Sequence, residues 1–318
     1  MLLIDLAFYI ISFAFVWISS GWIVFSVSKL ARRLRMSSFA ISFFILGLLT
    51  SIPELAVGIN SIANGTPEIF VGNLLGGIIL IFLFVIPLLA TIGGGIILKY
   101  KLDKKNLIVA LILMAVPSVM ITDKNITFYE SITIIILYFL TIYYVQSNNG
   151  IFHNIRNKIP HNKSFATHDI IKIIAGIFVI FVSSNFIVDR TVLFGDMLSI
   201  SPFYIGLIVL SLGTNIPELS IVIRSLRDNK KDIAFGNYVG SAAANAFLFG
   251  FLTLLNKKEI VTANNFFITF IFTLLALGLF YYFSKSKNNI SRKEGVILLV
   301  LYFLFVILEL VFAKLIIK

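Results

Sequence analysis

The chain has 318 residues, of which 59% are hydrophobic and only 13% are charged, and its mean hydropathy is +1.01. A soluble domain has roughly 45–50% apolar and about 25% charged residues, so this composition excludes a soluble enzyme, a nucleic-acid-binding domain and a disordered chain. The formal net charge of +11 therefore needs a membrane interpretation, and the absence of cysteine excludes disulfides and thiolate metal sites.

Apolar segments separated by short polar connections run along the whole chain. A transmembrane helix needs ~20 apolar residues, so the pattern predicts an all-α polytopic membrane protein with ten transmembrane helices. In chain order the predicted spans are 6–28, 38–63, 68–97, 106–121, 126–145, 169–188, 202–226, 232–255, 262–283 and 294–313. The first is not a cleavable signal peptide, because its basic cluster follows the apolar run. The longest connection, 146–168, contains His153, His161 and His168, which we interpret as solvated loop residues.

Lysine and arginine are distributed unevenly between alternate connections. Twenty of the 26 follow the odd-numbered spans, and the other six lie in the remaining connections and at the termini. The positive-inside rule then places both termini outside and the 146–168 loop in the cytoplasm. The positive charge reflects topology and contact with lipid headgroups, and no nucleic-acid partner is expected.

The two halves of the sequence are similar at a fixed offset of 164 residues. Thr-x-Ile-Pro-Glu-Leu occurs at 50–55 and 214–219, and Gly-Asn-x-x-Gly occurs at 72–76 and 236–240. Each half has five predicted spans, an odd number, so the second half is expected to be inverted in the bilayer, as in secondary transporters. We expect a first repeat at 1–145, with its motif region at 38–85. The second repeat is expected at 169–318, with its motif region at 202–249.

Two acidic residues lie deep in apolar segments at repeat-equivalent positions, Glu54 and Glu218. Ionisable groups at membrane depth are costly and usually mark function, although an isolated protonated Glu can also bond a neighbouring helix. A third, Glu309, has no counterpart in the first half, and we expect it to be structural or interfacial.

A proline directly precedes each of the paired glutamates. Pro53 and Pro217 lack an N–H and therefore free carbonyl groups in the preceding turn, which need a partner inside a bilayer. Carbonyl, hydroxyl and carboxylate oxygens on each helix form a cluster of hard ligands, and we expect the two clusters to face each other. Six to eight such ligands suit Ca²⁺, whereas Mg²⁺ prefers a tighter octahedron and transition metals prefer His or Cys.

The Gly-Asn segments contribute small residues for helix packing and two amides. Asn73 and Asn237 need partners if buried, so we expect them to bond the freed carbonyls or to support the glutamates. Farther along, Ser241 and Asn245 lie one helical turn apart on one face. The first-half counterpart of Ser241 is Gly77, so the predicted site is asymmetric.

These motifs resemble those of the sodium/calcium exchangers in the cation/Ca²⁺ antiporter superfamily. The residues that carry the resemblance are Leu-Thr-Ser-Ile-Pro-Glu at 49–54, Gly-Thr-Asn-Ile-Pro-Glu at 213–218, Gly-Asn-Leu-Leu-Gly-Gly at 72–77 and Gly-Asn-Tyr-Val-Gly-Ser at 236–241. The resemblance implies a transporter of the prokaryotic type in the plasma membrane, which is not an enzyme and has no cofactor. The 146–168 loop is too short for the Ca²⁺-sensing domains of some animal members.

The resemblance also implies roles for individual residues. Glu54 and Glu218 would bind Ca²⁺, with carbonyl and hydroxyl ligands from Thr50 and Thr214. Polar contacts to Na⁺ would come from Ser51 and Ser241. The complete predicted ion site consists of Glu54, Glu218, Thr50, Thr214, Ser51, Asn215, Ser241, Asn245, Asn73 and Asn237.

The chain departs from the family pattern at several of these positions. The family commonly has Ser, Asn, Ser and Asp where this sequence has Gly77, Ile81, Asn215 and Asn245. The cavity therefore loses one carboxylate and several polar ligands associated with Na⁺. Two glutamates carry a charge of about −2, which balances one Ca²⁺ or two monovalent ions, so we expect the divalent site to be retained better than the accessory Na⁺ sites.

The function that follows is exchange of Ca²⁺ for Na⁺ by alternating access, with spans 1 and 6 resembling the family's gate pair through Ser19, Ser20, Ser183 and Ser184. An H⁺-coupled Ca²⁺ or Mn²⁺ antiporter is an alternative, because a buried carboxylate without its cation can take up a proton. Further alternatives are a channel, a transport-impaired homologue and an intramembrane lipid-phosphate hydrolase. The hydrolase would need cationic groups that no mid-span Lys or Arg supplies. The sequence indicates the bilayer and the ions as partners, and no protein partner can be inferred.

Overall fold

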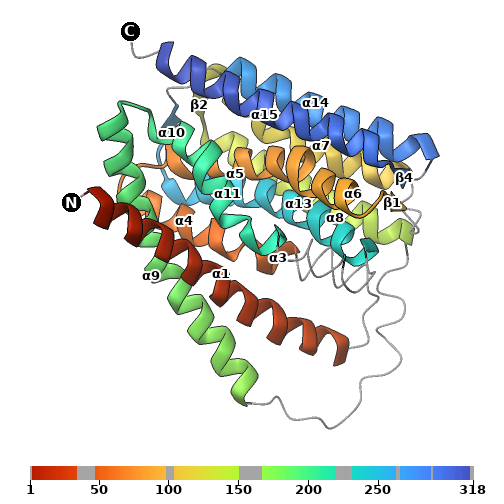
Figure 1. Cartoon of the computed structure of the whole chain (residues 1–318), viewed down its shortest axis with the longest axis horizontal. Coiled ribbons are helices and arrows are strands. Elements are labelled where there is room, and N and C mark those ends of the chain that lie inside the picture. Colours follow the sequence, from red (N-terminus) through yellow and green to blue (C-terminus); the bar gives the residue numbers. More distant parts are fainter. Residues whose placement is uncertain are drawn as a thin grey trace.

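The computed structural model describes residues 2–33, 47–97, 104–149, 167–219, 226, 231–262, 266–287 and 289–315. Helices lie within all ten predicted segments (Figure 1). In the first half they are α1 (Leu2–Arg33), α3 (Gly47–Thr50), α4 (Ile52–Ala63), α5 (Glu68–Leu80), η2 (Ile81–Val85), α6 (Ile86–Ile92), α7 (Lys104–Met120), η3 (Ile121–Asp123) and α8 (Phe128–Asn149). In the second half they are α9 (Thr167–Leu198), α10 (Pro202–Ile205), η4 (Gly206–Leu210), α11 (Ser211–Thr214), α13 (Lys231–Asn256), α14 (Phe266–Lys287) and α15 (Arg292–Leu315).

Among the described residues, seven helices are long and apolar enough to cross a membrane. Three shorter apolar helical stretches cover Ile52–Ala63, Phe128–Tyr144 and Pro202–Thr214. The protein is therefore a helical, multi-pass integral membrane protein, and the number of ten spans stays a prediction.

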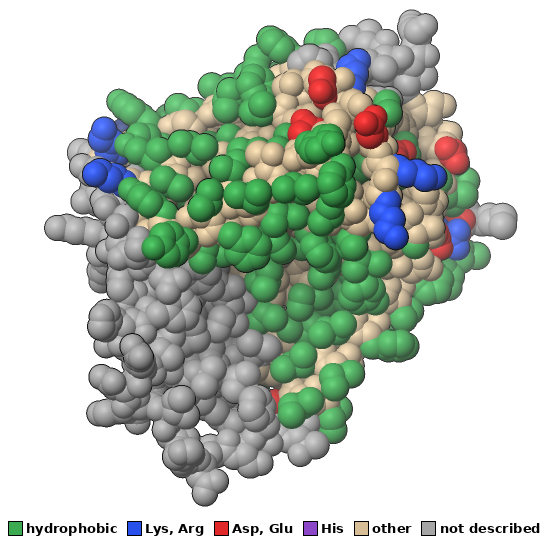
Figure 2. Space-filling model, turned by 180° about the vertical axis from the view of Figure 1, so that it is seen from behind, with side chains coloured by type: hydrophobic (Ala, Val, Ile, Leu, Met, Phe, Trp, Pro, Cys, Tyr) green, Lys and Arg blue, Asp and Glu red, His purple; other side chains and the backbone are tan. Residues whose placement is uncertain are grey.

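Apolar side chains cover much of the outer surface, as expected for a protein surrounded by lipid. On the face shown in Figure 2, hydrophobic side chains cover most of the described surface, and charged side chains gather toward two of its sides. Large exposed hydrophobic residues include Phe15, Trp17, Phe178, Phe186, Phe303 and Ile307.

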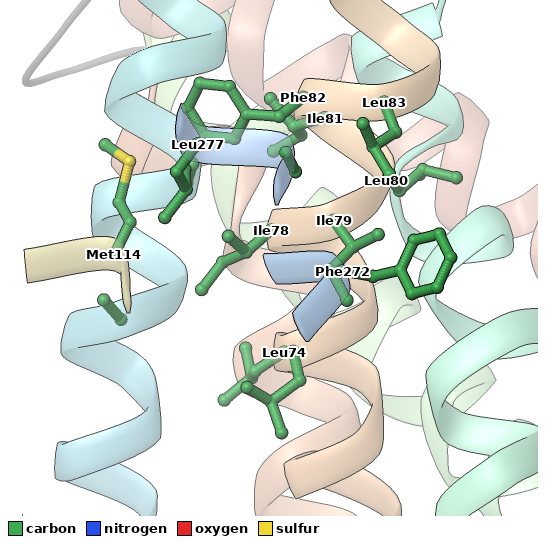
Figure 3. Close-up of a cluster of buried hydrophobic side chains, with 14 of the residues drawn as sticks. Leu74, Ile78, Ile79, Leu80, Ile81, Phe82, Leu83, Met114, Phe272 and Leu277 are labelled. Atoms are coloured by element: carbon green, nitrogen blue, oxygen red, sulfur yellow. The ribbon is translucent and has the colours of Figure 1, made fainter. Parts of the chain in front are cut away.

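The core forms around α5 and η2, which lie near the centre of the bundle (Figure 1). Every residue from Ile69 to Leu80 is buried, in agreement with a helix that is apolar on all sides. Side chains of α5 and η2 meet Met114 of α7 and Phe272 and Leu277 of α14 (Figure 3). The Gly-Asn segment of the first repeat is thus held in the most buried helix of the protein.

Helices α1 and α9 pack against each other along one side of the bundle (Figure 1). Helix α9 continues ten residues beyond the predicted end at residue 188, so that boundary was wrong. The reason is that the charged residues at this end have partners. Arg190 forms an ion pair with Asp5 of α1 at 3.3 Å, and Asp189 accepts a hydrogen bond from Asn64 at 2.8 Å.

Four two-residue strands add to the predicted all-helical structure. Strand β1 (Ile96–Ile97) pairs antiparallel with β4 (Asn289–Ile290), and β2 (Asn125–Ile126) pairs antiparallel with β3 (Ile260–Val261). Each pair joins two interhelical connections that the basic-residue pattern assigns to the same side of the membrane. The strand pairing therefore agrees with the predicted alternation of the connections.

Candidate ion-binding site

In both Pro-Glu motifs the helix ends at the threonine and is broken at the next residue. In the first repeat, α3 ends at Thr50 and α4 begins at Ile52, so Ser51 lies between the two helices. Pro53 stands in the first turn of α4, where its missing N–H removes no helical hydrogen bond. In the second repeat, α11 ends at Thr214 and Asn215 lies at the break. The proline motif thus interrupts the helix in both halves, as predicted.

The side chains at the two breaks make equivalent hydrogen bonds. Ser51 Oγ donates to the carbonyl of Gly47 at 3.0 Å, and Asn215 Nδ2 donates to the carbonyl of Ser211 at 2.8 Å. Donors and acceptors are related by the same 164-residue offset that relates the sequences. The two motifs therefore fold alike locally.

The two repeats interlock through glycines. A Cβ on Gly76 of α5 would lie 2.0 Å from the carbonyl oxygen of Leu207, and one on Gly72 would lie 2.1 Å from that of Phe203. On the other side of the site, a Cβ on Gly47 of α3 would lie 2.5 Å from the carbonyl carbon of Gly240 in α13. Because these helices touch backbone to backbone, each broken helix packs against the Gly-Asn helix of the other repeat.

Glu54 and Glu218 meet at the centre of this arrangement. Both side chains are 0% exposed, and their carboxylates are close enough to interact electrostatically. Neither has an ion pair with a Lys or Arg among the described residues. Two buried carboxylates in this position repel each other at low dielectric, and a cation between them would remove that cost.

Each of the two carboxylates has a threonine hydroxyl of the opposite repeat beside it. Thr214 of the second motif lies next to the carboxylate of Glu54, and Thr50 of the first motif lies next to that of Glu218. Ser241 Oγ donates to Glu218 Oε1 at 2.9 Å. Each carboxylate is therefore lined by the threonine of the opposite repeat.

Several polar atoms of the site have no hydrogen-bond partner of acceptable geometry among the described residues. They are both carboxylate oxygens of Glu54, Oε2 of Glu218, Oδ1 of Asn215, and Nδ2 of Asn73 and Asn245. Buried polar groups are normally hydrogen-bonded, so a group of free oxygens calls for a bound ion or water. The described residues contain no cluster of three or more His, Cys, Asp or Glu, so a cation here would depend on neutral oxygens as well.

Asn73 has another partner than expected, and the expectation for Asn237 is not tested by the described residues. Asn73 Oδ1 accepts a hydrogen bond from Thr214 Oγ1 at 3.2 Å, so this amide bonds neither a freed carbonyl nor a glutamate. Asn245 Oδ1 accepts from Ser51 Oγ at 3.3 Å, and Ser51 Oγ also lies 3.4 Å from Ser241 Oγ. Asn237 belongs to α13, but its side chain is outside the described residues.

Tyr238 is a site neighbour that the sequence analysis missed. Its side chain is fully buried, and its hydroxyl donates to the carbonyl oxygen of Glu218 at 3.5 Å. The repeat gave no signal for it, because the first-half counterpart is Leu74. A tyrosine inside a Gly-Asn-x-x-Gly segment is the feature that could have indicated it.

The third membrane glutamate is separate from the ion site. Glu309 of α15 is 0% exposed and accepts a hydrogen bond from Thr269 of α14 at 2.6 Å. The expected structural role fits this contact, whereas an interfacial position does not. His153 and His161 lie outside the described residues, and so does the side chain of His168.

The structure also describes the four serines that resemble the family's gate pair. Ser19 and Ser20 of α1 and Ser183 and Ser184 of α9 are all buried. Asn60 of α4 donates to Ser184 Oγ and, at 3.1 Å, to the carbonyl of Phe181. Ser184 is thus part of a polar contact between α9 and the helix that carries Glu54.

Known proteins share this sequence pattern and this fold. The family model for "Sodium/calcium exchanger protein" matches residues 4–146 and 168–311. "Uncharacterized membrane protein MJ0091" of Methanocaldococcus jannaschii is 24% identical over 305 residues, which cover 95% of this chain and 97% of the relative. "Sodium/calcium exchanger MaX1" of Methanosarcina acetivorans is 23% identical over an alignment of 354 positions, covering 96% and 99%.

A solved structure of the sodium-calcium exchanger NCX_Mj has a TM-score of 0.69 to this chain, with 22% sequence identity. The match covers 96% of this chain and 98% of that chain, so the two share their fold over almost their whole length. The family model spans both motif regions and more than half of the sequence. This protein therefore belongs to the sodium/calcium exchanger family, a family of membrane transporters and not of enzymes.

Proposed function

We propose that this protein exchanges Ca²⁺ for Na⁺ across the membrane by alternating access, with both ions bound between Glu54 and Glu218. The observation that carries the proposal is the pair of fully buried, unpaired carboxylates, three of whose four oxygens have no hydrogen bond among the described residues. Ionised carboxylates are stable at such depth only beside a cation.

The surrounding oxygens would complete the coordination. Ca²⁺ takes six to eight oxygen ligands in a flexible geometry, and the two carboxylates supply up to four of them. The remaining proposed ion-site residues are Thr50, Thr214, Ser51, Asn215, Ser241, Asn245, Asn73 and Asn237. Among these, the Oδ1 atom of Asn215 is the neutral side-chain oxygen that lacks a partner.

Exchange follows from competition for the same carboxylates. An empty site holds two buried negative charges without compensation, so moving it across the membrane is costly. The loaded site is compensated and can change its access. We propose that α1 and α9 move together against the remaining helices in this step, because they pack on each other along one side of the bundle.

We also propose an orientation for this architecture. Residues 1–145 and 169–318 form two inverted repeats, with both termini outside and the 146–168 loop in the cytoplasm of a prokaryotic cell. The equivalent hydrogen bonds at Ser51 and Asn215 support the repeat, and the two strand pairs support the alternation of connections.

Exchange of Ca²⁺ for H⁺ is the second candidate. It is favoured by the amides of Asn215 and Asn245, which occupy positions where the family commonly supplies a hydroxyl and a carboxylate. Two protons can neutralise Glu54 and Glu218 without any further ligand, whereas Na⁺ needs several oxygens.

The test is ⁴⁵Ca²⁺ uptake into sealed proteoliposomes under separate Na⁺ and H⁺ gradients. We expect uptake that follows the Na⁺ gradient. Glu54→Gln and Glu218→Gln should each weaken Ca²⁺ binding at least about 100-fold, because removing one partner of a buried charge site costs about 3–5 kcal/mol. Glu309→Gln is the matched control, since Glu309 is equally buried but bonds Thr269 away from the site, and it should change uptake by no more than about twofold.

The possible results separate the alternatives. Uptake that follows only the H⁺ gradient supports the second candidate, and uptake indifferent to both gradients contradicts antiport. Normal uptake by both central glutamine variants would show that Ca²⁺ binds elsewhere.

A further inference from the structure

The side of the ion site next to Gly77 is lined by amide nitrogens. A Cβ built on Gly77 would lie 2.5 Å from Asn245 Nδ2 and 3.2 Å from Asn215 Nδ2. The side-chain amide groups of Asn215 and Asn245 therefore both lie next to Gly77, which has no side chain. They fill the space that a larger residue would occupy.

A hydrogen bond fixes the orientation of the Asn215 amide. Asn215 Nδ2 donates to the carbonyl oxygen of Ser211 at 2.8 Å, an atom that can only accept. Asn245 Oδ1 lies 3.3 Å from Ser51 Oγ, and its Nδ2 lies on the side of Gly77. An amide N–H₂ has no free electron pair, so Asn215 cannot bind a cation through this atom, and Asn245 carries no charge with which to compensate one.

On the α5 side, the described side-chain oxygen of the proposed site is Oδ1 of Asn73, which already accepts a hydrogen bond from Thr214. Gly77 has no side chain, and Ile81, one turn farther on, is an apolar residue with 0% exposure. The nearby hydroxyl of Ser241 is hydrogen-bonded to Glu218 at 2.9 Å. The unpartnered oxygens among the described side chains of the proposed site are thus those of Glu54, Oε2 of Glu218 and Oδ1 of Asn215.

The charge of the site follows from these contacts. Its only acidic groups among the described residues are Glu54 and Glu218, and no cluster of three or more acidic or other metal-binding side chains occurs there. Two bound positive charges neutralise the pair. A third would stay uncompensated in a low-dielectric environment and next to the amide hydrogens, which is strongly unfavourable.

We infer that exchange by this protein is electroneutral, one Ca²⁺ against two monovalent cations, and that the Asn245 amide beside Gly77 sets this limit. The inference rests on the proposed function, because the charge count applies only if both ions use the site between Glu54 and Glu218. The inference adds two details to the proposed function. It gives the ratio of charges exchanged in each transport cycle, and it names Asn245 as the residue that determines this ratio.

The test measures Ca²⁺ accumulation at equilibrium in proteoliposomes with a fixed Na⁺ gradient and a K⁺–valinomycin potential. For wild type, the ratio of internal to external Ca²⁺ should not change between 0 and about −100 mV, and it should follow the square of the Na⁺ gradient. If one net charge moved per cycle, the same potential would shift the Ca²⁺ ratio about 50-fold. If protons are the coupling ions, the same measurement is made with a fixed pH gradient.

The Asn245→Asp variant tests the role of the amide. It replaces the N–H₂ group by a third carboxylate next to Gly77, so a third monovalent cation can bind. The Ca²⁺ ratio should then become voltage-dependent, by about 50-fold per 100 mV. Asn256→Asp is the matched control, because it adds the same charge to the last turn of the same helix, where the side chain contacts only the carbonyl of Lys258 in the described structure. This control should stay voltage-independent.

The outcomes are separable. Voltage-dependent accumulation in wild type overturns electroneutrality but leaves antiport intact, whereas no Ca²⁺ movement under either gradient overturns the proposed function itself. A voltage-independent Asn245→Asp variant that still transports Ca²⁺ overturns the assignment to Asn245. If that variant does not fold, the wild-type measurement alone decides the charge ratio.

Discussion

Side chains of the ion site bond across the two repeats. Thr214 donates to Asn73, and Ser51 contacts both Ser241 and Asn245. Each of these contacts joins a broken helix of one repeat to the Gly-Asn helix of the other. A substitution in either motif should therefore disturb both halves of the site.

The Thr214–Asn73 hydrogen bond offers a test at this scale. Thr214→Val keeps the volume but leaves both polar ends of the buried Asn73 amide without a partner, because Asn73 Nδ2 has none already. We expect a loss of stability of about 1–3 kcal/mol, measured as a lower melting temperature in detergent, together with slower Ca²⁺ exchange. Thr253→Val is the control, since the hydroxyl of this buried residue bonds only Phe249 in its own helix. An equal effect of both variants would contradict the special role of the inter-repeat contact.

At the scale of elements, glycine determines how closely the helices cross. Helix α5 touches the backbone of α10 and η4 at Gly72 and Gly76. The broken helices can reach the carboxylates of the opposite repeat only because these crossings are so close. The small residues thus contribute to the geometry of the site without binding an ion.

Replacing Gly76 tests this crossing. In Gly76→Ala the new Cβ would lie 2.0 Å from the carbonyl oxygen of Leu207, so α5 and η4 must separate. Such overpacking costs about 1–3 kcal/mol, which we expect to observe as reduced thermal stability and reduced exchange. Gly278→Ala in α14 is the control, because nothing lies within 4 Å of its Cβ and alanine favours a helix. Should both variants behave alike, close packing at Gly76 would not be the cause.

At the scale of the whole molecule, the helix pair α1–α9 contacts α4 through polar side chains and through apolar ones, such as Ile180 of α9 against Ala56. Asn60 bonds Ser184, and Asn64 bonds Asp189. Within the pair, contact is close: a Cβ on Gly176 of α9 would lie 2.9 Å from a side-chain carbon of Ile23 in α1. Close packing within the pair suits two helices that move as a unit against α4.

Cross-linking tests the proposed movement, and the lack of native cysteine makes it selective. A short bridge between Asn64→Cys and Asp189→Cys should hold α9 on α4 and stop Ca²⁺ exchange until a reductant is added. The control is a disulfide between Ile23→Cys and Gly176→Cys, where a Cβ on Gly176 would lie 2.9 Å from Cγ1 of Ile23 and the two helices are proposed to move together. We expect this control to transport normally, and continued exchange with the first bridge in place would contradict sliding of α9.

The orientation in the membrane is also testable with single cysteines. Lys258 and Lys293 are exposed residues on either side of α14. By the basic-residue pattern, Lys258→Cys should react with a membrane-impermeant maleimide in intact cells, and Lys293→Cys should react only after permeabilisation. The reverse labelling pattern would invert the proposed topology.

Hydropathy located the helices because lipid requires long apolar segments with internally satisfied backbones. The prediction was less good where charged residues have partners. The predicted span 169–188 ends before Asp189 and Arg190, but their bonds to Asn64 and Asp5 let α9 continue to Leu198. The partner of Asn73 was wrong for a similar reason, since it depends on a residue 141 positions away.

The sequence by itself determined the membrane class, the repeat, the breaks at the proline motifs and the two central glutamates. These features depend on local chemistry: apolar length, a missing N–H, and the cost of an acid in lipid. Only the tertiary structure decided which oxygens surround which carboxylate, that Tyr238 contacts Glu218, and that two amides converge on Gly77. These contacts join residues of opposite repeats, and their distances depend on how closely whole helices pack.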